Sequence, residues 1–310
     1  MDDRPTIDGE RRLIGTNEKR WPKEWASNQE ERMSSLVVNN NLAAIGAYNN
    51  LNSTDQMMTQ AISRLSSGLQ IQTAADNPAG YVIAESLNAE SNGYQTAISN
   101  AQNGVSMIQT ASGALNQIAN LLQSMNSLAL SSANGATQSS SSLAANQSEF
   151  VALQNQIDQI ANTTSFGTKA LLDGTFSNQV LQVGAFNNSN QQLSLSIGGA
   201  TTGALGVASS AVSVGSTASA QAAIAATQAA IDTVSTIEAS VGATQNQLSA
   251  VVANLTVGQQ NLQAAYSGLV DVNFAQETTR FTTDQILMQS GVAMLSQAQQ
   301  TSGLVLKLLG

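Results

Sequence analysis

Few residues of this chain carry groups that could perform chemistry. Its 310 residues include no histidine and no cysteine, with 20 acidic and 11 basic residues. Without an imidazole or a thiol, the chain can form neither a serine–histidine triad nor a cysteine nucleophile, and it lacks the usual ligands of zinc. The carboxylates show no paired spacing that would suggest hydrolysis. The sequence therefore predicts no enzyme activity, no bound metal and no cofactor.

Charge and hydropathy also restrict the partners that the chain can have. The net charge is −9, whereas proteins that bind nucleic acid neutralise phosphates with clustered lysine and arginine. No apolar run approaches the ~18 residues that a membrane-spanning helix needs. Charged residues make up only 10% of the chain, against about a quarter in ordinary globular domains. We therefore expect no nucleic-acid partner and no membrane insertion.

The first 32 residues differ in composition from the rest of the chain. They contain seven of the eleven basic residues, eight acidic residues and both tryptophans. No apolar stretch typical of a secretory signal follows the early basic residues. A disordered tail is one interpretation. We favour another, in which the gene start is assigned too early and Met33 is the real initiator. Residues 1–33 are then an atypical extension that the mature subunit lacks, except for Met33 where the initiator is kept. N-terminal sequencing of filament subunits, expected to begin at Met33 or Ser34, would test this.

From Met33 onward, the dominant pattern is an apolar residue at every third or fourth position. Narrow stripes of this kind form coiled-coil seams rather than the broad faces of globular helices. The positions between them hold mostly amides, hydroxyls and alanines, which a neighbouring helix can desolvate at lower cost than charged groups. We therefore expect long helices that are surrounded by other helices. The seam residues of the first and last predicted helices are Leu51, Met58, Ile62, Leu65, Leu69, Phe274, Phe281, Met288, Leu295 and Leu309.

Between the two sets of helices the pattern becomes alternating. Leu181 and Val183 alternate with polar residues, residues 187–190 have the composition of a turn, and a second alternating run begins at Leu193. This pattern predicts a β-hairpin around residues 178–198. The whole chain is expected to be mainly α. Its paired N- and C-terminal segments would form a long antiparallel, coiled-coil-like helical bundle with the small hairpin at the tip.

Several motifs of the chain resemble those of bacterial flagellin, and they occur in the order found in that family. The resemblance covers essentially all of residues 34–310 and implies a structural subunit that self-assembles into the extracellular flagellar filament for swimming motility. The matching segments include RLSSGL at 64–69, AADNPAG at 74–80, FGTKALL at 166–172, DVNFA at 271–275, QILMQ at 285–289 and LVLKLL at 304–309.

The resemblance also implies a domain layout. Residues 34–77 plus 265–310 would form an inner-core coiled-coil domain, and residues 78–264 an outer-core helical domain that carries the hairpin. Only about fifty residues lie between the flanking helices, so the resemblance implies a compact form that lacks the variable outer domains of many flagellins. The family further implies export by the flagellar type III route without a cleaved signal peptide. Its members' partners include the export apparatus, an export chaperone, and the hook-associated junction and cap proteins.

Two further candidate sites lie on the expected surface, and the first is Arg64, which belongs with the apolar residues to the predicted filament-assembly seam. Arg64 is a lone cation in a region almost free of charge, so we expect it to bond a carboxylate of a neighbouring subunit, such as Asp76 or Asp284. A second feature concerns the animal flagellin-sensing Toll-like receptor. Flagellins that it detects generally present an arginine, a leucine and a glutamate on the outer-core helices. The candidate receptor surface here comprises Ser124, Leu128 and Glu149, with serine in place of the arginine, so we expect weak activation.

Two other classes of protein remain open at this point. A hook–filament junction protein shares flagellin-like ends but has a more divergent middle. A coiled-coil signalling or effector protein would explain the helices but not the ordered motifs. Elongation of filament seeds separates these classes, since only flagellin should extend long filaments.

Overall fold

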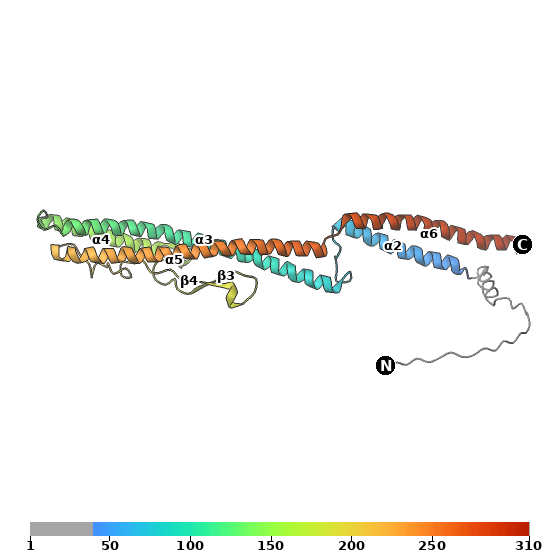
Figure 1. The fold of residues 1–310 in the computed structure, drawn as a ribbon, viewed down its shortest axis with the longest axis horizontal. Coiled ribbons are helices and arrows are strands. Elements are labelled where there is room, and N and C mark those ends of the chain that lie inside the picture. The colour runs from blue at the N-terminus through green and yellow to red at the C-terminus, as the bar shows by residue number, and fades with distance from the viewer. Residues whose placement is uncertain (1–39, 310) are drawn as a thin grey trace, which may run out of the picture. The chain divides into compact units, whose positions relative to one another are not determined.

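The computed structural model describes the backbone of residues 40–309 and the side chains up to residue 300. The expected extension, residues 1–33, lies outside the described residues. Long helices dominate the described part (Figure 1), which confirms the expectation of a mainly α fold. They are α2 (Leu42–Ser67), α3 (Pro78–Ser132), α4 (Ser140–Thr163), α5 (Thr217–Val270) and α6 (Phe274–Leu309). The short elements are β1 (Ser165–Phe166), β2 (Lys169–Ala170), β3 (Gln179–Gln182), β4 (Gln192–Leu195) and the 3₁₀ helix η1 (Ser189–Gln191).

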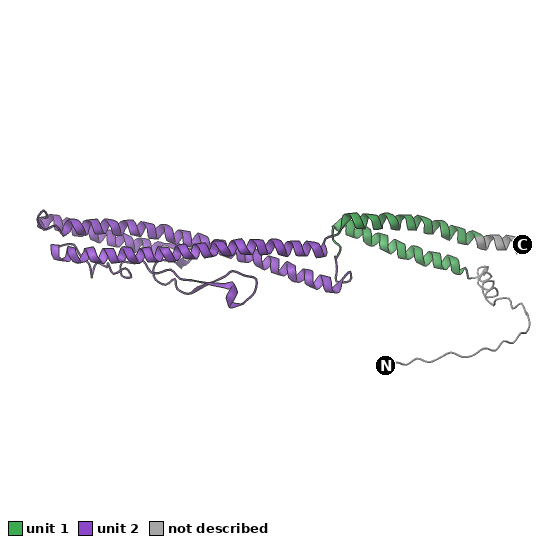
Figure 2. Ribbon diagram, viewed as in Figure 1, with its two compact units in different colours: residues 1–70, 272–310 green, residues 71–271 purple. Residues whose placement is uncertain are grey.

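The chain divides into two compact units, which Figure 2 distinguishes by colour. Unit 1 comprises residues 1–70 and 272–310, and unit 2 comprises residues 71–271. These limits follow the ends of α2 and α5. The sequence-based boundary between residues 264 and 265 falls inside α5, because that helix continues to Val270 without a helix-breaking residue.

Local sequence explains where the helices begin and end. The side chain of Asn41 caps α2 by accepting a hydrogen bond from the amide of Ala44 (3.0 Å), and Gly68 ends the helix at φ +75°, a conformation that glycine adopts without steric cost. Asn77 caps α3 in the same way through the amide of Gly80 (3.0 Å). Pro78 follows at the first helical position, where its missing N–H costs nothing.

The hydrophobic core lies in unit 2. Helix α3 packs against both α4 and α5 (Figure 1). The apolar residues at three- and four-residue spacing along α3 include four that are fully buried, namely Leu115, Ile118, Leu122 and Met125. Phe150 and Ile157 of α4 bury their side chains in the same cluster. Unit 2 therefore has the core of an independently folded body.

An irregular segment, residues 196–216, completes this core, and one face of α4 holds it with polar side chains. Asp158 accepts hydrogen bonds from the amide and the hydroxyl of Thr202 (both 2.8 Å). Gln154 is buried and donates to the carbonyl of Val207 (2.7 Å). A segment without regular structure satisfies only some of its backbone groups internally, and these side chains supply partners for others.

The expected hairpin is present as β3 and β4, which pair antiparallel with Leu181 opposite Leu193. It lies along α3, where Asn100 donates to the carbonyl of Gln182 (3.2 Å) and an added Cβ at Gly104 would meet Leu181 at 2.8 Å. The sequence placed the hairpin at the tip of the bundle. An isolated two-stranded hairpin is marginally stable, so it packs its apolar side on α3 instead.

Candidate assembly surface

Unit 1 consists of an antiparallel pair of helices, α2 and α6. At one end of the pair the side-chain amide of Asn41 donates to the carbonyl of Ala298 (2.8 Å). At the other end the amide of Val272 donates to the carbonyl of Gly68 (2.8 Å). The N- and C-terminal segments therefore run side by side, as the matching seams predicted.

This pair has almost no core of its own. Among the described residues of unit 1, only four are buried: Thr54, Ala61, Val272 and Glu277. The predicted seam residues lie along both helices, but none is buried. Seven of the apolar seam residues are of intermediate exposure, namely Leu51, Met58, Leu65, Leu69, Phe281, Met288 and Leu295. The side chain of Leu309 lies outside the described residues.

The remaining two seam residues lie largely in solvent. Ile62 is 47% exposed and Phe274 is 57% exposed. They belong to a larger set of bulky apolar side chains that unit 1 leaves uncovered, which we call the apolar surface of unit 1. Its members are Leu42, Ile45, Tyr48, Met57, Ile62, Phe274, Ile286, Leu287, Val292 and Met294. So many exposed bulky apolar side chains on a two-helix unit are typical of an interaction site.

Arg64 forms an ion pair inside the subunit that the sequence analysis did not anticipate. Its guanidinium lies 3.8 Å from the carboxylate of Glu277, and the two side chains are only 16% and 7% exposed. The other oxygen of Glu277 lies 3.7 Å from Arg280, which is 58% exposed. Only the register of α2 against α6 brings Arg64 and Glu277 together. The expected bonds from Arg64 to Asp76 or Asp284 of a neighbouring subunit stay predictions.

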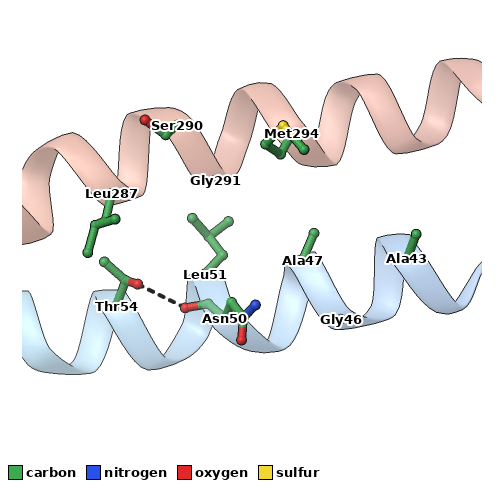
Figure 3. Close-up of a pocket in the computed structure, with 10 residues that line it drawn as sticks. All are labelled: Ala43, Gly46, Ala47, Asn50, Leu51, Thr54, Leu287, Ser290, Gly291 and Met294. Atoms are coloured by element: carbon green, nitrogen blue, oxygen red, sulfur yellow. Dashed lines mark hydrogen bonds between the residues drawn. The ribbon is translucent and has the colours of Figure 1, made fainter.

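A pocket of about 510 Å³ lies between α2 and α6. Figure 3 shows Ala43 and Ala47 pointing across the gap toward α6, and Leu51 extending toward Gly291. An added Cβ at Gly46 would meet no atom within 4 Å. Small residues therefore leave the gap empty within one subunit. Its ten lining residues, Ala43, Gly46, Ala47, Asn50, Leu51, Thr54, Leu287, Ser290, Gly291 and Met294, include no charged group.

These features define a helical structural protein whose N- and C-terminal helices pair without forming a core. No group of histidine, cysteine or acidic residues within the described part could hold a metal ion, and none of its helices combines the length and apolarity needed to cross a membrane. Comparison with known proteins identifies the family. The chain matches the bacterial flagellin N-terminal helical region over residues 38–177 and the C-terminal helical region over residues 224–309.

Two relatives in sequence agree with this match. A flagellin of Halalkalibacterium halodurans is 39% identical over 274 residues, covering 88% of this chain and 100% of the relative. A flagellin of Bacillus subtilis is 35% identical over 305 residues, with the same coverage of both chains. The crystal structure of Bacillus cereus flagellin is similar with a TM-score of 0.44 and 27% identity, covering 54% of this chain and 94% of that chain.

The chain belongs to the bacterial flagellin family. It is a structural subunit of the flagellar filament rather than an enzyme, and its form is compact and lacks the outer domain. Flagellin polymerises with itself, and its homologues form the extracellular filament. Nothing favours a junction protein or a coiled-coil effector.

The three residues of the candidate receptor surface lie on α3 and α4. Ser124 and Glu149 are exposed, whereas Leu128 is partly buried against the core. The hydroxyl of Ser124 donates to the carbonyl of Asn120 within its own helix (3.0 Å). A hydrogen bond from Asn146 to Ser132 (2.9 Å) joins α4 to α3 beside these residues.

Proposed function

We propose that subunits of the filament associate through unit 1, with the predicted seam residues and the apolar surface of unit 1 as the contact. The observation that carries this proposal is that only four described residues of unit 1 are buried. Two helices without a core gain too little from burial to offset the conformational entropy lost on folding. A second subunit supplies the missing apolar partner. The two sides of such a contact differ, so the assembly extends as a helix instead of closing into a ring.

The same deficit of burial supports a proposal about export. Terminal segments that fold only on assembly can pass unfolded through a narrow channel. We therefore assign this chain to the flagellar type III export route, with the export apparatus and an export chaperone as partners inside the cell. Hook-associated junction and cap proteins would contact the ends of the filament. The experiment for this route is secretion of the chain from a strain with and without a functional flagellar export apparatus.

The pocket between α2 and α6 gives a direct test of the assembly surface. We expect a second copy to cover it in the filament, because an uncharged gap of this size costs packing energy when it is left open. The chain contains no cysteine, so Gly46→Cys introduces a single thiol at a position with free space around it. If contact with the second copy stabilises the covered state of the thiol by about 1.4 kcal/mol or more, maleimide should label it at least about tenfold more slowly in filaments than in monomers.

Two controls make this result specific. Filaments of Gly46→Cys that have been depolymerised should regain the reactivity of the monomer. Gly46→Ala should still form filaments, which shows that substitution at this position permits assembly. If filaments form normally but the thiol stays fully reactive, only the proposed contact at the pocket is contradicted. If the unmodified chain fails to elongate seeds, the assembly function itself is contradicted.

The outer-core helices support a proposal about host recognition. Serine at position 124 cannot supply the planar fork of donors that an arginine offers to an acidic or amide partner. Loss of such an anchor costs at least about 2 kcal/mol, or roughly thirtyfold in affinity. We expect weak activation of the flagellin-sensing Toll-like receptor.

Ser124→Arg should restore part of the activity in a reporter-cell titration. Ser127→Arg is the matched control, because it adds the same charge at another exposed position of α3. Equal gains from both variants would indicate a general effect of charge. Potency of the unmodified chain equal to that of a strongly detected flagellin would refute the expectation.

A further inference from the structure

Three asparagine–glycine pairs in unit 2 occupy very different environments. Asn92–Gly93 and Asn103–Gly104 lie within α3, and Asn134–Gly135 lies in the turn between α3 and α4. Asparagine is a chemically labile residue. It is most labile before glycine, because glycine has no Cβ to hinder its own backbone nitrogen or to restrict its backbone angles. Structure must then decide which of the three pairs reacts.

The two helical pairs are held in an unreactive geometry. Within α3 each glycine N–H is committed to the carbonyl four residues earlier, so its nitrogen cannot approach the preceding side chain unless the helix opens. Both glycines are also crowded. An added Cβ would meet Ala185 at 2.5 Å from Gly93 and Leu181 at 2.8 Å from Gly104. The packed hairpin therefore opposes rearrangement of the backbone at either position.

The turn pair is held less firmly, because it lies outside the helix and the nearest atom to an added Cβ at Gly135 belongs to the side chain of Thr217, at 3.0 Å. Asn134 and Gly135 are exposed, and the backbone bonds that hold the turn are long. The amide of Asn134 lies 3.3 Å from the carbonyl of Ser131, and the amide of Gly135 lies 3.1 Å from that of Ala133. The amide of Thr137 lies 3.4 Å from the carbonyl of Asn134. Hydrogen bonds near these lengths weaken, so the turn opens more readily than α3.

We propose that Asn134–Gly135 is a site of spontaneous deamidation. The backbone nitrogen of Gly135 attacks the side-chain carbon Cγ of Asn134 and forms a five-membered succinimide. The side-chain amide bond breaks, and its nitrogen leaves as ammonia with the proton from Gly135. Water then opens the ring at either carbonyl and yields aspartate or isoaspartate. No oxidant or enzyme is required.

The reaction changes the turn in two ways. Each product carries a negative charge where the subunit had a neutral amide, and isoaspartate adds one carbon to the main chain. Gly135 lies beside the first residue of α5, since an added Cβ would meet Cγ2 of Thr217 at 3.0 Å. Isoaspartate lengthens the main chain and therefore changes the contact between the turn and α5. Aspartate keeps the length of the main chain and adds only the charge. A filament outside the cell is not resynthesised in place, so the modified fraction should increase with the age of the subunit.

Peptide mapping by mass spectrometry tests this proposal on the full chain. After incubation of native protein at mildly alkaline pH, Asn134 should deamidate at least about tenfold faster than Asn92 and Asn103, because the helical sites react only after local opening. In denatured protein the three pairs should react at similar rates. Gly135→Ala should slow the reaction at Asn134, and Asn134→Gln should abolish it. Equal native rates at the three sites, or no native reaction at Asn134, would overturn the proposal.

Discussion

Met288→Asp should give a soluble subunit that fails to polymerise. Met288 is of intermediate exposure on α6. If a second subunit completes its burial, the new carboxylate is left without a partner, at a cost of about 3 kcal/mol or more per subunit. That cost corresponds to at least about a hundredfold rise in the concentration needed for assembly. Sedimentation of seeded reactions measures the change.

Two comparisons separate the effect of charge from other effects. Met288→Leu keeps the volume and the apolar character of the side chain, so it should polymerise nearly normally. Circular dichroism should show that both variants keep the helices of unit 2, whose buried core does not include Met288. Long filaments formed by Met288→Asp at the usual concentration would exclude this position from the assembly contact.

A second large effect is expected from the ion pair in unit 1. Arg64→Leu removes one partner of Glu277, whose carboxylate is only 7% exposed. A charge that is buried without adequate compensation destabilises a protein by about 3 kcal/mol. Because unit 1 has so little other burial, we expect this loss to appear as a lower melting temperature of the filament. Thermal depolymerisation followed by light scattering measures it.

Arg280 provides the matched control. It approaches the same carboxylate at 3.7 Å but is 58% exposed, so Arg280→Gln should cost no more than about 1 kcal/mol. The double variant Arg64→Leu/Glu277→Leu removes both buried charges and should recover most of the stability lost in Arg64→Leu. The buried pair does not act as a unit if the double variant loses the sum of the stabilities lost in the two single variants. The same conclusion follows if Arg64→Leu and Arg280→Gln lose equal stability.

Much of the secondary structure could be predicted from local pattern. The three- and four-residue spacing along α3 and α4 corresponds to buried positions such as Leu115 and Phe150. The alternation around Leu181 and Leu193 corresponds to the register of β3 with β4. These predictions succeed because burial on one side of a helix or strand imposes a period on the sequence itself.

Other features of the chain, the end of unit 2 and the surface on which the hairpin packs, carry no such local pattern. The pattern of α5 continues smoothly to Val270, so no local signal marks the end of unit 2. The hairpin also carries no local signal for the surface that it packs on. Its position depends on Gly104, because the missing Cβ of this residue makes room for Leu181. A glycine within a helical pattern does not show in the sequence which group will pack against it.

The sequence by itself determined the helices, the hairpin pairing, the absence of residues for cysteine or histidine chemistry and the resemblance to flagellin. All of these depend on residue type and on short-range spacing. Only the tertiary structure decided that Arg64 faces Glu277, that a pocket opens beside Gly46 and that α4 holds residues 196–216. Such contacts join residues far apart in the chain, and their geometry depends on the register between helices. Helical seams built from repeated apolar and small residues permit several registers, so packing of the whole chain selects one of them.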